Sequence, residues 1–226
     1  MRKLRNPLVL NIGAGKIEYD LLNNINTTII NHLSNFIKPP VSFNLDKNYI
    51  QYELDRDIHE IERLFVVDKI KYDTPSTFYI SNDVFSFINH TRLKFDLIVM
   101  HRFLEHIPFD KVLYFIYLLS TICNEGTLLD IIVPDFNELA SMVCNEDVNS
   151  KDFDKNNIII SSEIVNETDD PHLSIWTAER LMYFFEYEGR FNLKTITKNF
   201  KYDGRNIYLR AIIERNSENN ELFFWE

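Results

Sequence analysis

LVLNIGAGKI, spanning Leu8 to Ile17, is the stretch that decides the fold. Its apolar start predicts a buried strand, and Gly13 and Gly15 predict a tight turn that leads into a helix. In a doubly wound sheet such a turn lies at the carboxyl ends of the strands, where ligands bind. The helix after it offers free N–H groups. Two glycines alone are a weak motif, so a turn without a ligand stays open as an alternative.

The composition predicts one soluble domain over residues 1–226. The chain has 226 residues, of which 45% are hydrophobic, enough for a single core. Its net charge of −10 disfavours nucleic acid as a partner, although this argument does not apply to an enzyme that binds nucleic acid through a single basic patch. Cys123 and Cys144 lack CxxC spacing, which indicates a reducing compartment. Without an apolar run of roughly 18 residues, no membrane span is predicted, and we expect a cytoplasmic protein.

The hydrophobic spacing predicts alternating helices and strands in the first half of the chain. FVVDKIKYD, after the second predicted helix, fits either a continuation of that helix or an extra strand. The other predicted elements are a helix over 18–37, a short strand stopping at Asp46, a helix from Glu53 to Phe65, a strand over 77–81 and a short helix in ISNDVFSFI.

The second half continues the alternation and ends differently. KFDLIVMH predicts a strand ending near His101, and Lys111 to Cys123 predicts a helix. The remaining predictions are a turn at Gly126, a strand closed by Pro134, a polar insertion or flap from Asn137 to Pro171, a helix from Thr177 to Glu188 ended by Gly189, and two strands joined through Asp203 and Gly204. This order predicts an α/β fold with a doubly wound, mostly parallel sheet and a C-terminal antiparallel hairpin.

Polar side chains follow successive predicted strands at Asp46, at Asn82 with Asp83, and in LIVMHRFLEH. All would lie on the same edge of the sheet as Gly13. A nucleoside suits this distribution, because one carboxylate can accept bonds from ribose hydroxyls and another from an exocyclic amine, while Val84 and Phe85 cover the base. For any one of these carboxylates, a loop or helix-cap role is the alternative.

Nearly the whole chain resembles the class I S-adenosylmethionine-dependent methyltransferases, and within them the small bacterial and phage enzymes with LEH and VPDF motifs. The matching pieces, in order, are LVLNIGAGK, NLD, ISNDVFSFI, FDLIVMHRFLEHIP, EGTLLDIIVPDF and HLSIWTAERLMYFFEYEGRF. The resemblance implies a Rossmann-like, seven-stranded fold that binds S-adenosylmethionine. The residues it implies for the cofactor are Asn11, Gly13, Ala14 and Gly15 for the methionine part, Asp46 for the ribose, Asn82, Asp83 and Val84 for the adenine, and Met100 with His101 beneath the sulfonium.

Three residues depart from the pattern of that superfamily. Asn11 stands where an acid is common, and Ile17 stands at the position of the third glycine. Asp68, which ends FVVD, competes with Asp46 for the ribose. We favour Asp46, because it directly follows the first helix and an alternating strand.

His101, Glu105 and His106 form an HxxxEH pattern, and His172 follows the polar insertion. A divalent metal site is one interpretation. Arg102 replaces the first acidic ligand that some similar O-methyltransferases carry, and it would repel a cation, so we expect no metal. We predict instead that His106 is structural and that His101 accepts a proton from the methyl acceptor. His172 either reaches the substrate or pairs with nearby Asp169 and Asp170.

The sequence thus predicts transfer of a methyl group to an O or N atom of a small molecule, such as a sugar or a nucleotide-linked metabolite. The acceptor would lie between the His101 loop, residues 137–171 and His172. NPPY and Pro-Cys motifs of nucleobase methyltransferases are absent from the sequence. Because of Asn11, Ile17 and Arg102, a catalytically inactive binding or regulatory subunit is the alternative.

Overall fold

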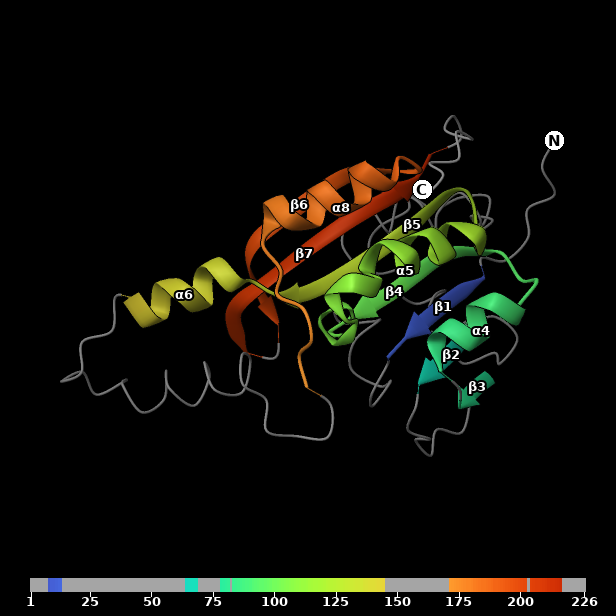
Figure 1. The fold of residues 1–226 in the computed structure, drawn as a ribbon, viewed down its shortest axis with the longest axis horizontal. Coiled ribbons are helices and arrows are strands. Elements are labelled where there is room, and N and C mark those ends of the chain that lie inside the picture. Colours follow the sequence, from blue (N-terminus) through green and yellow to red (C-terminus); the bar gives the residue numbers. More distant parts are fainter. Residues whose placement is uncertain are drawn as a thin grey trace, which may run out of the picture.

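The computed structural model describes residues 8–13, 64–68, 78–81, 83–144, 171–202 and 204–216. Their strands form one mixed sheet in the order β3-β2-β1-β4-β5-β7-β6 (Figure 1). The expected α/β architecture is therefore confirmed. The strands are β1 (Val9–Ile12), β2 (Leu64–Asp68), β3 (Phe78–Ser81), β4 (Phe95–His101), β5 (Cys123–Pro134), β6 (Phe191–Tyr202) and β7 (Arg205–Arg215).

One strand of this sheet, β7, runs against all the others. β3, β2, β1, β4 and β5 are parallel, whereas β7 runs antiparallel to both β5 and β6. Because the carboxyl ends of the parallel strands share one edge, the ends of β1, β2 and β4 lie together there.

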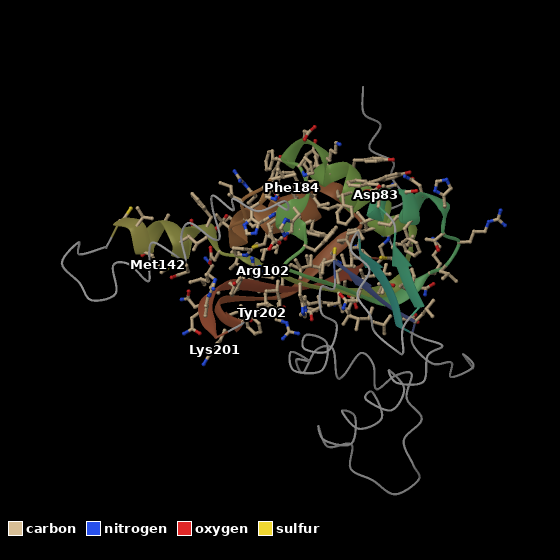
Figure 2. All side chains as sticks on the ribbon, turned by 90° about the horizontal axis from the view of Figure 1, so that it is seen from below. Asp83, Arg102, Met142, Phe184, Lys201 and Tyr202 are labelled. Atoms are coloured by element: carbon tan, nitrogen blue, oxygen red, sulfur yellow. The ribbon has the colours of Figure 1, made fainter. Side chains whose placement is uncertain are left out.

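Three helices cover one face of the sheet: α4 (Val84–His90), α5 (Val112–Thr121) and α8 (Ala178–Glu188). The main apolar core lies between these helices and the sheet, and it contains Ile98 and Met100 of β4, Phe115 of α5 and Phe185 of α8. Figure 2 shows the helices, with Phe184, on one side of the sheet. Alternate residues of a strand point to opposite faces, so His101 of β4 lies on the face away from this core.

The predicted helix between Thr177 and Glu188 is confirmed together with both of its caps. The Thr177 side chain accepts a hydrogen bond from the backbone N–H of Arg180, which is the expected N-cap contact. Gly189 ends the helix in the left-handed conformation with φ of 80°, where a residue with a Cβ would be strained.

The structure corrects three boundaries. Leu64 and Phe65 belong to β2 and not to a helix, because they extend an apolar run that pairs with β1. Gly126 has φ of 78° inside β5, at an irregularity in the pairing with β4, so it forms a bulge and not a turn. Residues 137–144 of the predicted insertion lie in helix α6 (Phe136–Cys144), whose apolar face contacts β7.

The predicted elements over 18–37 and at Asp46 lie outside the described residues, as do residues 53–63 and 145–170. Two short 3-10 helices, η2 (Leu104–His106) and η3 (Phe109–Lys111), follow β4. None of the helices that the structure describes is long and apolar enough to cross a membrane.

Candidate functional site

Gly13 adopts the predicted left-handed conformation at the carboxyl end of β1, with φ of 65°. A Cβ built on Gly13 would overlap the ring of Phe103, which follows β4. The glycine is therefore required for two reasons, its backbone conformation and the close approach of Phe103. No sequence pattern predicted this role of Phe103, although the residue directly precedes the LEH motif.

The other predicted cofactor residues have different positions in the structure, and some of them lie outside the described residues. Asp83 caps α4, its carboxylate accepting a hydrogen bond from the Ser86 N–H at 3.0 Å, as the cap alternative predicts. Asn11 is buried in β1. The side chains of Val84, on α4, and Met100, on β4, both pack in the main apolar core between the helices and the sheet. Ala14, Gly15, Asp46 and Asn82 lie outside the described residues.

Asp68 is the last residue of the strand next to β1. Ile12 pairs with Val67, so Asp68 stands level with Gly13 at the carboxyl edge. The strand order thus places the backbone of Asp68 beside β1, whereas Asp46, which the sequence favoured for the ribose, lies outside the described residues.

Behind this edge, β4, β5 and β7 share a buried ionic network. The Asp130 carboxylate accepts hydrogen bonds from Arg210 Nε at 2.9 Å and Arg210 Nη2 at 2.8 Å. His101 Nε2 lies 2.9 Å from the same carboxylate and donates to it. All three side chains are buried, and His101 Nδ1 has no hydrogen-bond partner among the described residues.

Two basic side chains, His101 and Arg210, contact the Asp130 carboxylate and influence its ionisation. Burial raises the pKa of this carboxyl group, but the charge and hydrogen bond of His101 and those of Arg210 outweigh it, and the net pKa is lowered. Asp130 is therefore a carboxylate at neutral pH, and it orients the His101 ring with Nδ1 as the remaining nitrogen.

A second polar cluster forms where the segment 171–176 crosses η2. The Glu105 carbonyl accepts hydrogen bonds from the N–H groups of Leu173 at 2.7 Å and Ser174 at 3.0 Å. The Ser174 hydroxyl donates to the Leu104 carbonyl at 3.1 Å and accepts from Trp176 Nε1 at 3.0 Å. Trp176 is buried in the core, and Phe136 N–H donates to its carbonyl. These bonds hold the segment between η2 and the end of β5.

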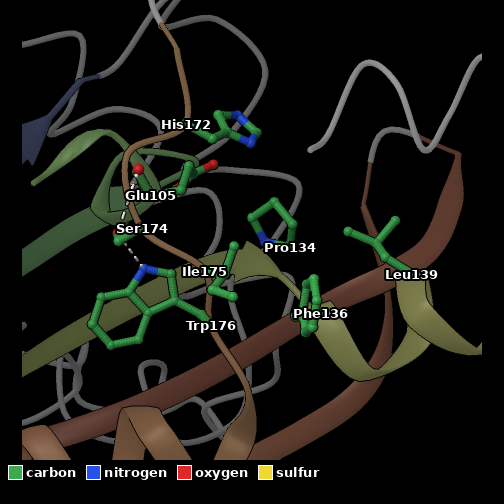
Figure 3. Close-up of a pocket in the computed structure, with 8 residues that line it drawn as sticks. All are labelled: Glu105, Pro134, Phe136, Leu139, His172, Ser174, Ile175 and Trp176. Atoms are coloured by element: carbon green, nitrogen blue, oxygen red, sulfur yellow. Dashed lines mark hydrogen bonds between the residues drawn. The ribbon is translucent and has the colours of Figure 1, made fainter. Parts of the chain in front are cut away.

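A pocket opens beside this segment (Figure 3). It is lined by Glu105, Pro134, Phe136, Leu139, His172, Ser174, Ile175 and Trp176, and its empty volume, open solvent included, is about 250 Å³. The Glu105 side chain is only 1% exposed and extends toward the His172 ring. Burial raises the pKa of Glu105, although Arg102, His106 and His172 oppose the rise.

Each oxygen of Glu105 has a different environment. Oε1 accepts a hydrogen bond from Arg102 Nε at 3.3 Å, whereas Oε2 is buried with no hydrogen-bond partner among the described residues. Arg102 has φ of 55° and also donates to the Tyr208 hydroxyl at 3.0 Å. Glu105, His106 and His172 place one ligand-type atom each within 4.8 Å of one another.

The two predicted catalytic histidines have different surroundings among the described residues. His172 lines the pocket, but His101 is not among its lining residues and belongs to the Asp130 network. Asp130 and Arg210 were missed by sequence reasoning. The sequence does contain a signal. LLDIIV has one acidic residue and YLRAII has one basic residue inside an otherwise apolar strand, and buried charges require a partner.

No protein-family model and no curated protein matches the chain. Among solved structures, it is similar to the N-methyltransferase NodS of Bradyrhizobium japonicum bound to S-adenosyl-L-homocysteine, with 11% identity, TM-score 0.50, and coverage of 93% of this chain and 79% of NodS.

A 1,6-didemethyltoxoflavin N1-methyltransferase of Burkholderia thailandensis, with its substrate and S-adenosylhomocysteine, has 10% identity and TM-score 0.50, covering 94% of this chain and 72% of the enzyme. A SAM-dependent methyltransferase of Methanosarcina mazei has 13% identity and TM-score 0.51, and the match covers 93% of this chain and 92% of that enzyme. The chain therefore has a methyltransferase-like α/β fold.

Proposed function

We propose that this protein is an S-adenosylmethionine-dependent methyltransferase that acts on an O or N atom of a small molecule, such as a sugar or a nucleotide-linked metabolite. The observation that carries the proposal is the strand order β3-β2-β1-β4-β5-β7-β6, with the left-handed Gly13 at the carboxyl end of β1. Structural neighbours with this fold were crystallised with S-adenosylhomocysteine, the product of that cofactor.

The residues at the carboxyl edge fit a sulfonium nucleoside. Gly13 ends β1 in a left-handed conformation that glycine favours, which is where the cofactor would approach the backbone. Asp68, at the end of β2, or Asp46 would accept hydrogen bonds from the ribose, and we favour Asp68 because its strand adjoins β1. Asp83, at the start of α4, would accept from the adenine amine. The cofactor would supply an electrophilic methyl group on a positively charged sulfur.

We place the acceptor in the pocket between η2, α6 and His172. Phe136 and Leu139 provide its apolar wall, and Glu105 and His172 provide polar atoms that can orient a hydroxyl or amine. Methyl transfer depends mainly on alignment, so positioning is the principal task of these residues. His101 does not line this pocket, because its ring is held by Asp130 through Nε2, so Glu105 and His172 are the groups that could receive a proton from an acceptor bound there.

A catalytically inactive binding subunit is the second candidate, and Phe103 favours it. Its ring lies against Gly13, at the turn where a cofactor would approach the backbone. Under this alternative, the glycine serves the packing of Phe103 alone.

Thermal unfolding with S-adenosylhomocysteine tests the proposal. At 100 times the dissociation constant, a ligand stabilises the folded state by about 2.7 kcal/mol. We expect Asp68→Ala to weaken this stabilisation and Asp46→Ala to leave it unchanged. No stabilisation of the wild type at millimolar nucleoside would favour the inactive subunit.

A further inference from the structure

We propose that Glu105, His106 and His172 form a binding site for a divalent transition-metal ion such as Zn²⁺. These residues come from η2 and from the segment that crosses it, so the site exists only in the folded chain. Two imidazoles and one carboxylate form a ligand set that suits zinc and related ions, with positions left for water or another ligand.

The Glu105 carboxylate supplies the main evidence for a ligand. Its Oε2 atom is buried without a hydrogen-bond partner among the described residues, although the side chain is 1% exposed. A buried carboxylate oxygen with no donor is costly, and a bound cation would satisfy it. Glu105 and His172 both line the adjacent pocket, which is open to solvent, so an ion could reach them.

His106 is held in an orientation suited to metal binding. Its Nδ1 lies 3.2 Å from the Pro171 carbonyl oxygen, and because a carbonyl only accepts, Nδ1 carries the proton. The lone pair of the neutral ring is then on Nε2. Metal-binding histidines commonly donate their other ring N–H to a backbone carbonyl in this way, which fixes both tautomer and ring direction.

His172 completes the set from the opposite side. Its ring centroid lies 4.9 Å from that of His106, with 77° between the ring planes. The hydrogen bonds of Leu173 and Ser174 to the Glu105 carbonyl fix the backbone beside His172. Ligand atoms on tetrahedral zinc lie roughly 3.4 Å apart. Atoms already within 4.8 Å of one another therefore need side-chain rotation only.

Arg102 was the reason to expect no metal, and its observed contacts weaken that objection. The guanidinium binds Oε1 of Glu105 and the Tyr208 hydroxyl, and Oε2 is left to the ion. Its positive charge still opposes a cation nearby. The site thus makes a specific prediction: Arg102→Gln should bind the metal more tightly than the wild type.

Titration of the purified full chain with Zn²⁺ and Co²⁺ by calorimetry tests the site without the methyl-transfer reaction. We expect one ion per chain. His106→Gln and His172→Gln should each weaken binding at least 10-fold, since even residues that only support metal ligands contribute 10- to 100-fold. His90→Gln is the matched control, because His90 is an exposed histidine on α4 and should leave affinity unchanged.

A variant that gains an absorption band distinguishes the loss of a metal ligand from misfolding. His172→Cys should keep Co²⁺ binding and add a thiolate-to-cobalt absorption band that the wild type lacks. The proposal is overturned if the wild type binds no ion at millimolar metal, if His90→Gln loses as much affinity as His172→Gln, or if the cysteine variant binds Co²⁺ without the new band. Since no cofactor is present, failure here leaves the proposed methyl transfer standing.

Discussion

Asp130 and Glu105 are both buried acids, yet their surroundings have opposite effects. Asp130 receives two hydrogen bonds from Arg210 and one from His101, and its pKa is lowered. Glu105 receives one long hydrogen bond from Arg102, and burial raises its pKa. The first acid is satisfied by the fold, whereas the second is left incomplete beside a pocket. The contrast separates a structural charge from one available to a ligand.

Asp130→Ala should produce the largest loss of stability. It leaves Arg210 buried without its carboxylate, and breaking a buried ion pair costs about 3–5 kcal/mol. Urea unfolding at pH 7 measures the change. Equal stability of variant and wild type would mean that the network contributes nothing to the fold.

Ser174→Ala should have an intermediate effect. It removes the acceptor of the buried Trp176 N–H and the donor to the Leu104 carbonyl, at a cost of about 1–3 kcal/mol. Because Ser174 fixes the segment that carries His172, the variant should also bind Zn²⁺ more weakly. A destabilised variant with unchanged zinc affinity would show that the segment does not position His172.

Glu105→Gln and Asp130→Asn should differ in how pH changes their stability relative to the wild type. With a raised folded pKa, Glu105 binds protons more readily in the folded than in the unfolded state, so its contribution to stability falls as pH rises through that pKa. In the absence of metal, the free energy of unfolding of Glu105→Gln should therefore rise relative to that of the wild type, by about 1 kcal/mol, as pH increases from 4 to 8.

Asp130→Asn should behave in the opposite sense. The lowered pKa means that Asp130 stabilises the protein fully above its unfolded pKa of roughly 3.9 and loses this contribution as pH falls through the folded pKa. The deficit of Asp130→Asn should thus be largest near neutral pH and shrink in acid. Parallel pH profiles for the two variants would remove the distinction between the two acids.

Lys198→Ala should have the smallest effect. Lys198 pairs with Glu179 at 3.0 Å, but both side chains are more than half exposed. Exposed pairs of this kind contribute about 0.2–1 kcal/mol. Urea unfolding of this variant measures the stability that an exposed charge pair contributes. A loss of stability as large as that of Asp130→Ala would contradict the expectation that a buried ion pair contributes more than an exposed one.

Local signals were sufficient for much of the fold. The apolar strand ending at His101, the helix after Lys111 and the Thr177 and Gly189 caps follow from spacing and from cap chemistry, which act over a few residues. Leu64 and Phe65 were assigned to a helix because a short apolar run has no clear period, and only pairing with β1 identifies a strand.

The candidate site depended on contacts that no local pattern records. His172 meets Glu105 because Leu173 and Ser174 bind the Glu105 carbonyl across 68 and 69 positions of sequence. The left-handed Arg102 separates the direction of His101 from that of Glu105, so the HxxxEH spacing does not correspond to one cluster.

Strand β7 connects the two acids through a pair of neighbours on one face. Tyr208 holds Arg102, the partner of Glu105, and Arg210 holds Asp130. The two residues are two positions apart, so a small slide of β7 along β5 would change both environments together. A change at the pocket would in this way reach the Asp130 network on the same face of the sheet, with one strand as the mechanical link.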